Sequence, residues 1–139
     1  MEVRREGNII VAKFVDGEII ENMKHLAEKE NIDSAIVLSG IGMLKNVEIG
    51  YFTGKEYKIG KIKEPVELVS LQGNIGKGND IICHFHVAIA GKNHEIKGGH
   101  LLRGEVKVVN EIAILRLEEV KIRRKKNVVG LMEMMLKKE

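Results

Sequence analysis

The sequence predicts an α+β fold: a mostly antiparallel or mixed β-sheet with one long helix and a short C-terminal helix. Most of the chain consists of short apolar, β-branched runs separated by glycines, a pattern typical of strands. Only Glu18–Glu30 places apolar residues at helical spacing, with lysine and glutamate at the positions between. The order strand, helix, strand and then a series of strands indicates an α+β arrangement.

The expected elements follow one another with no internal repeat and no linker. A strand at 8–15 precedes the helix, and the apolar segment Ser34–Gly40 follows it. Further strands are expected at 44–53, 55–62, 66–73, 80–90, 94–102, 105–109 and 111–119. The apolar tail Val128–Leu136, rich in methionine and leucine, is predicted as the terminal helix. Gly73–Gly78 is expected to be a hairpin loop, because no helix follows it as a dinucleotide fingerprint requires.

Composition narrows the class of protein. A chain of 139 residues with 44% hydrophobic content is predicted to form one domain over residues 1–139. Charged residues are frequent but nearly balanced, with a net charge of +3, so charge alone does not indicate nucleic-acid binding. The bias toward lysine and glutamate is similar to that of hyperthermophile proteins. One cysteine, a charged N-terminus and no long apolar run predict a cytoplasmic protein.

Four of the five histidines lie between Cys83 and His100. His84 and His86 stand two apart in a run of strand-forming residues. Successive side chains of a strand alternate between faces, so both imidazoles are expected on one face. The opposite face, which includes Cys83, is expected to belong to the core.

The register of the following hairpin decides whether a third histidine joins the pair. If Gly91–Asn93 is a three-residue loop with Asn93 left-handed, Ala90 pairs with His94 and His84 lies opposite His100. All three histidines then share one face. A loop of two or four residues would turn His100 to the other face.

Three neutral imidazoles, from His84, His86 and His100, suit zinc or another divalent transition metal and leave one position open. The plainer alternative is a half-exposed polar strand face without a metal. His25, on the predicted helix, and His94, at the hairpin mouth, are expected to be surface residues. Cys83 points away from the pair and is expected to be a buried thiol.

One basic run offers contacts to phosphate groups: Lys121, Arg123, Arg124, Lys125 and Lys126. It contains no aromatic residue, and the acidic pair Glu118–Glu119 precedes it. A solvated strand end or an ion-pair cluster between subunits is the alternative interpretation.

Three segments together resemble the PPC domain, named for its conservation in plants and prokaryotes. They are SAIVLSGIGMLKNVEIGYF (34–52), EPVELVSLQGNIG (64–76) and HVAIAGKNHEIKGGHLLRGEV (86–106). The resemblance implies a mostly antiparallel sheet with few helices and a homotrimer. Plant members bind A/T-rich DNA through an AT-hook, which needs an Arg-Gly-Arg-Pro core; Pro65 is the single proline here, so this sequence has no hook. His84, His86 and His100 match the prokaryotic members that resemble metal binders.

Three functions therefore remain in view. The first is a homotrimeric protein with a regulatory or ligand-binding role that binds a divalent metal, with zinc as the preferred candidate. The second is a DNA-associated protein whose binding is weak and salt-sensitive. The third is a metal-dependent hydrolase, which would need a general base such as Glu67 or Glu95 near the metal. The sequence gives no catalytic residue, so enzyme activity is not predicted.

Overall fold

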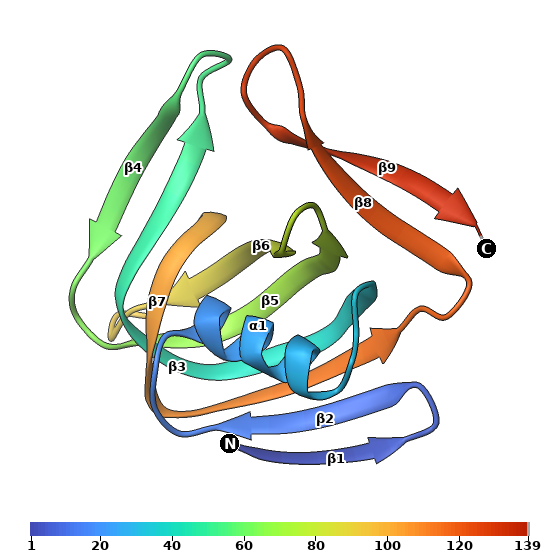
Figure 1. The fold of residues 1–139 in the computed structure, drawn as a ribbon. Helices are drawn as coiled ribbons and strands as arrows, with labels where there is room; N and C mark the ends of the chain where they lie inside the picture. Colours follow the sequence, from blue (N-terminus) through green and yellow to red (C-terminus); the bar gives the residue numbers. More distant parts are fainter. Residues whose placement is uncertain (139) are drawn as a thin grey trace.

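The computed structural model describes residues 1–138, in which nine strands join one sheet and a single helix packs against it (Figure 1). The elements are β1 (Glu2–Glu6), β2 (Ile9–Phe14), α1 (Ile19–Lys29), β3 (Ala35–Phe52), β4 (Tyr57–Ile62), β5 (Val66–Lys77), β6 (Ile81–Ala90), β7 (Ile96–Arg116), β8 (Val120–Lys126) and β9 (Met132–Lys138).

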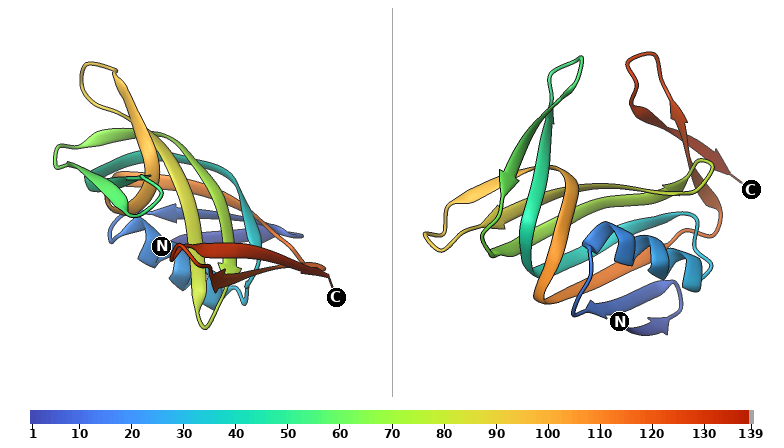
Figure 2. Two further views of the ribbon diagram at one scale, coloured as in Figure 1. Left: turned by 90° about the horizontal axis from the view of Figure 1, so that it is seen from above. Right: turned by 60° about the vertical axis from the view of Figure 1, so that its left-hand side comes forward.

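Four strands pair in a closed circuit, which positions the functional site. β3 pairs with β5, β5 with β6, β6 with β7, and β7 with β3, all antiparallel. The sheet therefore curls on itself, and the curvature is visible in both views of Figure 2. Register shifts between β3 and β7, for example between Gly42 and Met43, supply the bends that such long strands need.

The prediction gave the helices too large a share of the fold. α1 has 11 residues and is the only helix in residues 1–138, so the expected long helix is wrong. Glu18 caps it by accepting hydrogen bonds from the backbone N–H groups of Ile20 and Glu21. Within the part of the chain that the structure describes, no helix has the length and hydropathy needed to span a membrane.

The predicted C-terminal helix is also wrong. Met132–Lys138 is a strand that pairs with β8 from Lys126↔Met132 to Val120↔Lys138. Asn127 forms the turn that reverses the chain, because its side-chain oxygen accepts from Leu131 N at 3.0 Å and Gly130 takes a φ of 88°. Pairing with the preceding strand β8 thus outweighs the helix propensity of methionine and leucine.

Several expected strands merge. The segments predicted at 34–40 and 44–53 form most of β3, and those at 94–102, 105–109 and 111–119 contribute to β7. Asn110, which separates two of the expected strands, is fully buried within β7, where its amide donates to Met43 O at 2.9 Å. Gly73 and Gly76, expected in a loop, lie inside β5. A register shift between β3 and β7 accommodates Asn110, whereas Gly73 and Gly76 pair regularly with Phe85 and Ile82, so these residues do not end the strands.

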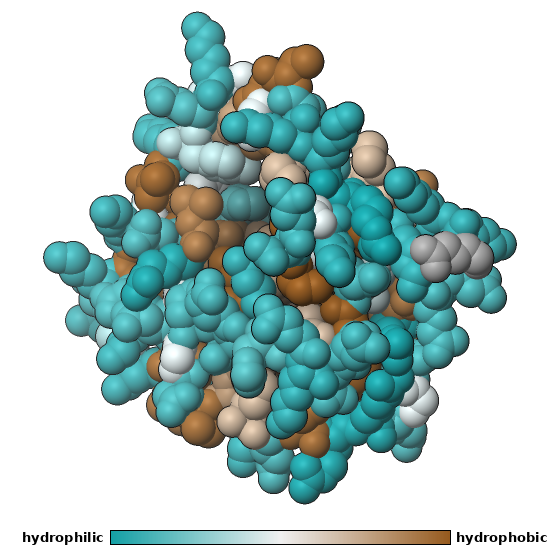
Figure 3. Space-filling model, viewed as in Figure 1, coloured by the Kyte–Doolittle hydropathy of each residue, from teal (hydrophilic) through white to brown (hydrophobic). Residues whose placement is uncertain are grey.

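The core lies between α1 and the concave side of the curled sheet. Ile19, Met23 and Leu26 on α1 are fully buried, as are Phe14 and Phe85 from the strands. The opposite side of α1 carries charged residues, and the face of the molecule seen in Figure 3 is predominantly hydrophilic.

Cys83 is partly buried against the core, and this burial raises the pKa of its thiol to about 12. The thiol is therefore protonated at neutral pH, as expected for an inert cysteine.

Candidate metal centre

The strand β6 carries the first two histidines on one face, as the alternation predicts. Phe85 and Val87, on the opposite face, are 1% and 5% exposed and belong to the core. His84 is half-buried, and His86 is exposed. Alternation along the strand was sufficient to predict the shared face of these two histidines, because the other face of β6 packs against the core.

The predicted hairpin register is wrong by two residues. The loop comprises the five residues 91–95, so Ala90 pairs with Ile96 and His86 lies opposite His100. A shift by two keeps every side chain on its face, so His100 still joins His84 and His86.

The reason for the shift lies in the loop itself. His94 rather than Asn93 takes the left-handed conformation, with a φ of 65°, and its N–H donates to Gly91 O at 2.9 Å. The left-handed residue therefore stands one position later than expected. Pairing resumes only at Ile96.

His84, His86 and His100, here called the histidine triad, converge in space. One ligating nitrogen from each lies within 4.8 Å of the others. The ring centroids are separated by 5.2 Å between His84 and His86, 5.2 Å between His84 and His100, and 5.4 Å between His86 and His100. His25 and His94 are exposed and lie outside this group.

Two imidazoles of the triad have lowered pKa values and are neutral at neutral pH. Burial, and then the neighbouring His84 and His86, lower the pKa of His100 to about 4. Burial also lowers the pKa of His84, with further contributions from Arg124 and His86. Neutral imidazoles keep the lone pairs that a metal requires.

Two further observations fit a metal in the triad. The Nδ1 atom of His100 is buried and has no hydrogen-bond partner within residues 1–138. Tyr57 from β4 stacks on the same ring, with centroids 5.0 Å apart, and so fixes its orientation. Nitrogens on one tetrahedral zinc stand about 3.3–3.4 Å apart, so small ring movements would suffice to bind the ion.

Residues 1–118 match the model of the Plants and Prokaryotes Conserved domain. The chain belongs to this family. A plant- and prokaryote-conserved (PPC) protein from Pyrococcus horikoshii is 36% identical, with a TM-score of 0.86 over 96% of this chain and 93% of that one. A metal-containing protein from Archaeoglobus fulgidus is 29% identical, with a TM-score of 0.83 over 96% of this chain and 95% of that one.

A third solved structure supports the fold alone. A proposed DNA-binding protein from Bacteroides thetaiotaomicron is 23% identical, with a TM-score of 0.89 over 96% of both chains. No curated protein matches the chain.

In this PPC protein the triad stands between two cavities. One, of about 390 Å³, is lined by His84 and His100 together with Tyr57 and the C-terminal hairpin formed by β8 and β9. The other, of about 260 Å³, is lined by His86 with Ser70 and Gln72 of β5. The hairpin follows the residues that the family model matches, yet it supplies a wall of the larger of these two cavities.

The basic run is only partly available to a partner. Arg124 is 8% exposed, and Arg123 lies 3.4 Å from the carboxylate of Asp33. Burial alone would raise the pKa of Asp33, but hydrogen bonds from Ser34 and Arg123 outweigh it and lower that pKa. Lys125 and Lys126 are exposed and Lys121 is half-buried.

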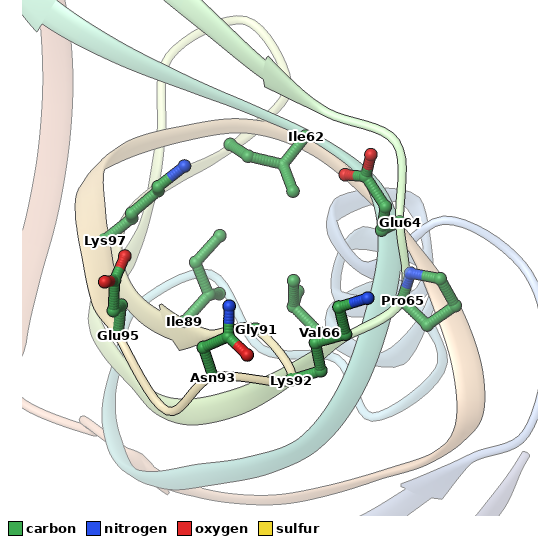
Figure 4. A pocket seen from close by; sticks show the side chains of 10 residues that line it. All are labelled: Ile62, Glu64, Pro65, Val66, Ile89, Gly91, Lys92, Asn93, Glu95 and Lys97. Carbon is green, nitrogen blue, oxygen red and sulfur yellow. The ribbon is translucent and has the colours of Figure 1, made fainter.

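The general bases suggested for a hydrolase lie elsewhere. Glu67 pairs with Ala90, at the far end of β6 from His84. Glu95 belongs to a separate cavity of about 570 Å³ at the β6–β7 loop (Figure 4). There Ile62, Val66 and Ile89 form an apolar lining, and charged side chains including Glu95 surround it. Within residues 1–138, the linings of the two cavities beside the triad include neither glutamate.

Sequence reasoning missed Tyr57, Asn74 and Arg124 as neighbours of the triad. Tyr57 reaches it through the pairing of β4 on β3 and Arg124 through β8 beside β5, whereas Asn74, expected in a loop, lies opposite His84 in the β5–β6 hairpin. The alternation of the basic run contained a signal, since Ile122 and Arg124 share a face. An apolar residue on that face indicates that Arg124 turns inward.

Proposed function

We propose that this PPC protein binds one divalent transition metal ion per chain through His84, His86 and His100. Zinc is the preferred candidate. The observation that carries the proposal is the convergence of three imidazoles, with ligating nitrogens within 4.8 Å of one another, on one sheet face. The metal-containing relative from Archaeoglobus fulgidus supports it. A bound zinc would supply a Lewis acid with one open coordination position.

The protein's own residues give this site the character of a binding site rather than a closed structural one. The triad provides three ligands, whereas closed zinc sites have four. Cavities of about 390 and 260 Å³ lie beside it. We therefore assign the site a ligand-binding or regulatory role.

Elemental analysis of protein purified without a histidine tag tests the metal proposal. About one zinc per chain is expected near neutral pH, and a His84→Ala/His100→Ala variant is expected to lose it. The matched control is His25→Ala/His94→Ala, which removes two exposed histidines and is expected to keep the zinc. Full zinc content in the first variant would rule out the assignment.

We also propose a homotrimer, which the family resemblance implies and the surface supports. Ile9 of β2 and Ile36 of β3 both pair with Leu115 of β7, so outward apolar side chains form a row across three strands. Val11 and Leu38 extend this patch and are 53% and 51% exposed. An apolar area of this kind is typical of a permanent interface.

Light scattering tests the assembly. A mass about three times 15.6 kDa is expected. Val11→Glu/Leu38→Glu is expected to dissociate it, whereas Val128→Glu, at a fully exposed position, is expected not to. A wild-type protein that is monomeric and folded at micromolar concentration would contradict the proposal.

Association with DNA is a second, weaker candidate. The exposed lysines Lys125 and Lys126, with the half-buried Lys121, offer phosphate contacts. Binding through so few contacts is expected to fade steeply as salt rises. A sequence-specific complex at physiological salt and nanomolar protein would show that this surface has a larger role.

A further inference from the structure

The C-terminal hairpin places a buried guanidinium beside the histidine triad. Ile122 and Arg124 share the inward face of β8 and are 1% and 8% exposed. Arg124 Nη2 donates to Asn74 Oδ1, and Nη1 donates to Met132 O at 3.1 Å. Asn74 pairs with His84 across β5 and β6, so these bonds hold the guanidinium next to the strand that carries the triad.

Arg124 is a buried cation whose hydrogen-bond partners in residues 1–138 are uncharged. They are an amide oxygen and a backbone carbonyl, and the buried Nε atom has no partner among the described residues. Burial of the charge lowers the pKa of the guanidinium, although arginine remains charged in proteins. A charge removed from water is costly unless it is paired, so this position favours an anion.

The cavity beside the triad brings the arginine and the metal ligands to the same space. Its volume is about 390 Å³, within the usual range for small-molecule sites, and His84, His100 and Arg124 all line it. The rest of the hairpin wall combines the apolar side chains of Leu131, Met132 and Met134 with Asn127, Gly130 and the carboxylate of Glu133. The cavity thus has one buried guanidinium beside the triad and a hairpin wall that is largely apolar but carries one carboxylate.

We propose that this cavity binds a small organic carboxylate with an apolar body. One carboxylate oxygen would occupy the open position of the metal, and the carboxylate would pair with Arg124. The inference rests on the proposed metal site. A carboxylate fits better than a phosphate, because a single guanidinium does not supply the several donors that a phosphate uses, and the carboxylate of Glu133 in the same lining disfavours a more highly charged anion.

Cobalt-loaded protein offers a direct test, because the visible spectrum of Co²⁺ reports both metal binding and a change of ligand. Acetate and hexanoate are titrated separately into wild-type protein, with inorganic phosphate as the alternative anion. Both carboxylates are expected to change the spectrum, and hexanoate is expected to bind more tightly because the hairpin wall is apolar.

Arg124→Gln is the test variant, since glutamine retains a donor toward Asn74 or Met132 but lacks the charge. Carboxylate affinity is expected to fall roughly tenfold or more, with the cobalt spectrum of the anion-free protein unchanged. Arg123→Gln is the matched control, because Arg123 lies on the other face of β8 against Asp33. It is expected to bind the carboxylates as wild type does.

The outcomes separate the two proposals. Cobalt binding that requires the triad, without any response to carboxylates or with equal affinity in Arg124→Gln, overturns the ligand inference and leaves the metal site standing. A response to phosphate alone overturns the choice of carboxylate. Failure of cobalt to bind the triad overturns both.

Discussion

The histidine triad and the C-terminal hairpin face the same cavity but are held in different ways. β6 is paired with β5 from Lys77↔Ile81 to Glu67↔Ala90 and with β7 from His86↔His100 to Ala90↔Ile96. The hairpin, in contrast, shares only the backbone pair Lys77↔Arg123 with β5. Side chains provide the rest of its attachment, since Ile122 N donates to Ser34 Oγ and Arg124 donates to Asn74.

The difference predicts two kinds of behaviour at one site. Strands paired on both sides open only with the whole sheet, whereas an element attached by a few side chains opens locally at lower cost. His86 and His100 are paired on both sides and His84 is paired with Asn74 of β5, so we expect the three histidines to form a rigid floor of the cavity. Arg124 belongs to the hairpin wall, which we expect to be displaced separately.

The largest expected effect comes from Gly73→Ala, which disrupts the β5–β6 pairing beside His84. Gly73 has a φ of 140°, and a Cβ there would stand 1.9 Å from the backbone oxygen of His84. We expect a loss of about 3 kcal/mol or more in the free energy of unfolding, together with weaker metal binding. Denaturant unfolding measures it, and Gly91→Ala, where a Cβ meets nothing within 4 Å, is the control. Equal stability of the two variants would show that the β5–β6 pairing is not rigid.

A smaller and more local effect is expected from Gly76→Ala, which weakens the packing of the C-terminal hairpin against β5. A Cβ at Gly76 would lie 2.6 Å from Ile122 Cγ2 and 3.0 Å from Ile122 O. We expect a loss of about 1–3 kcal/mol, with faster amide exchange in β8 and β9 and unchanged exchange in β6. Gly60→Ala, which makes an ordinary contact at 3.5 Å, is the control. Equal loss of protection in β6 would mean that the hairpin and the floor unfold together.

The smallest expected effect concerns pH in the metal-free protein. His100 has a pKa lowered from 6.5 to about 4, chiefly by burial, so the unfolded chain binds its proton first as pH falls. Stability is therefore expected to decrease between about pH 6.5 and 4, and His84, whose pKa is also lowered, acts in the same direction.

Comparison with His100→Gln isolates this contribution from that of the carboxylates, which also titrate in acid. The variant should lose less stability than wild type between pH 7 and pH 4.5 in denaturant titrations. An identical loss in the two proteins would show that the imidazole is not held neutral by the fold.

The sequence was informative where a short-range rule decides the structure. Alternation placed His84 and His86 on one face, and the same rule preserved the face of His100 although the hairpin register was wrong by two residues. The register itself depends on the loop, where His94 takes the left-handed conformation that was expected of Asn93. Loop geometry of this kind is not fixed by residue preferences alone.

Pairing and packing of whole strands explain most of what the sequence did not predict. Nothing local to Met132–Lys138 favours a strand, and the segment becomes β9 only because Asn127 turns it back onto β8. The sequence placed Arg124 in a basic run that was interpreted as solvated. In the structure, packing of β8 against Ser34 and Gly76 buries this residue. The triad could therefore be proposed from sequence, whereas its neighbouring arginine could not.

Anomalous diffraction at the zinc edge, from crystals of zinc-loaded protein, tests the central claim most directly. The account predicts one strong peak per chain, about 2.0–2.1 Å from one nitrogen each of His84, His86 and His100. A zinc peak bound by other residues, or three histidines that share no peak in protein that contains zinc, would contradict it.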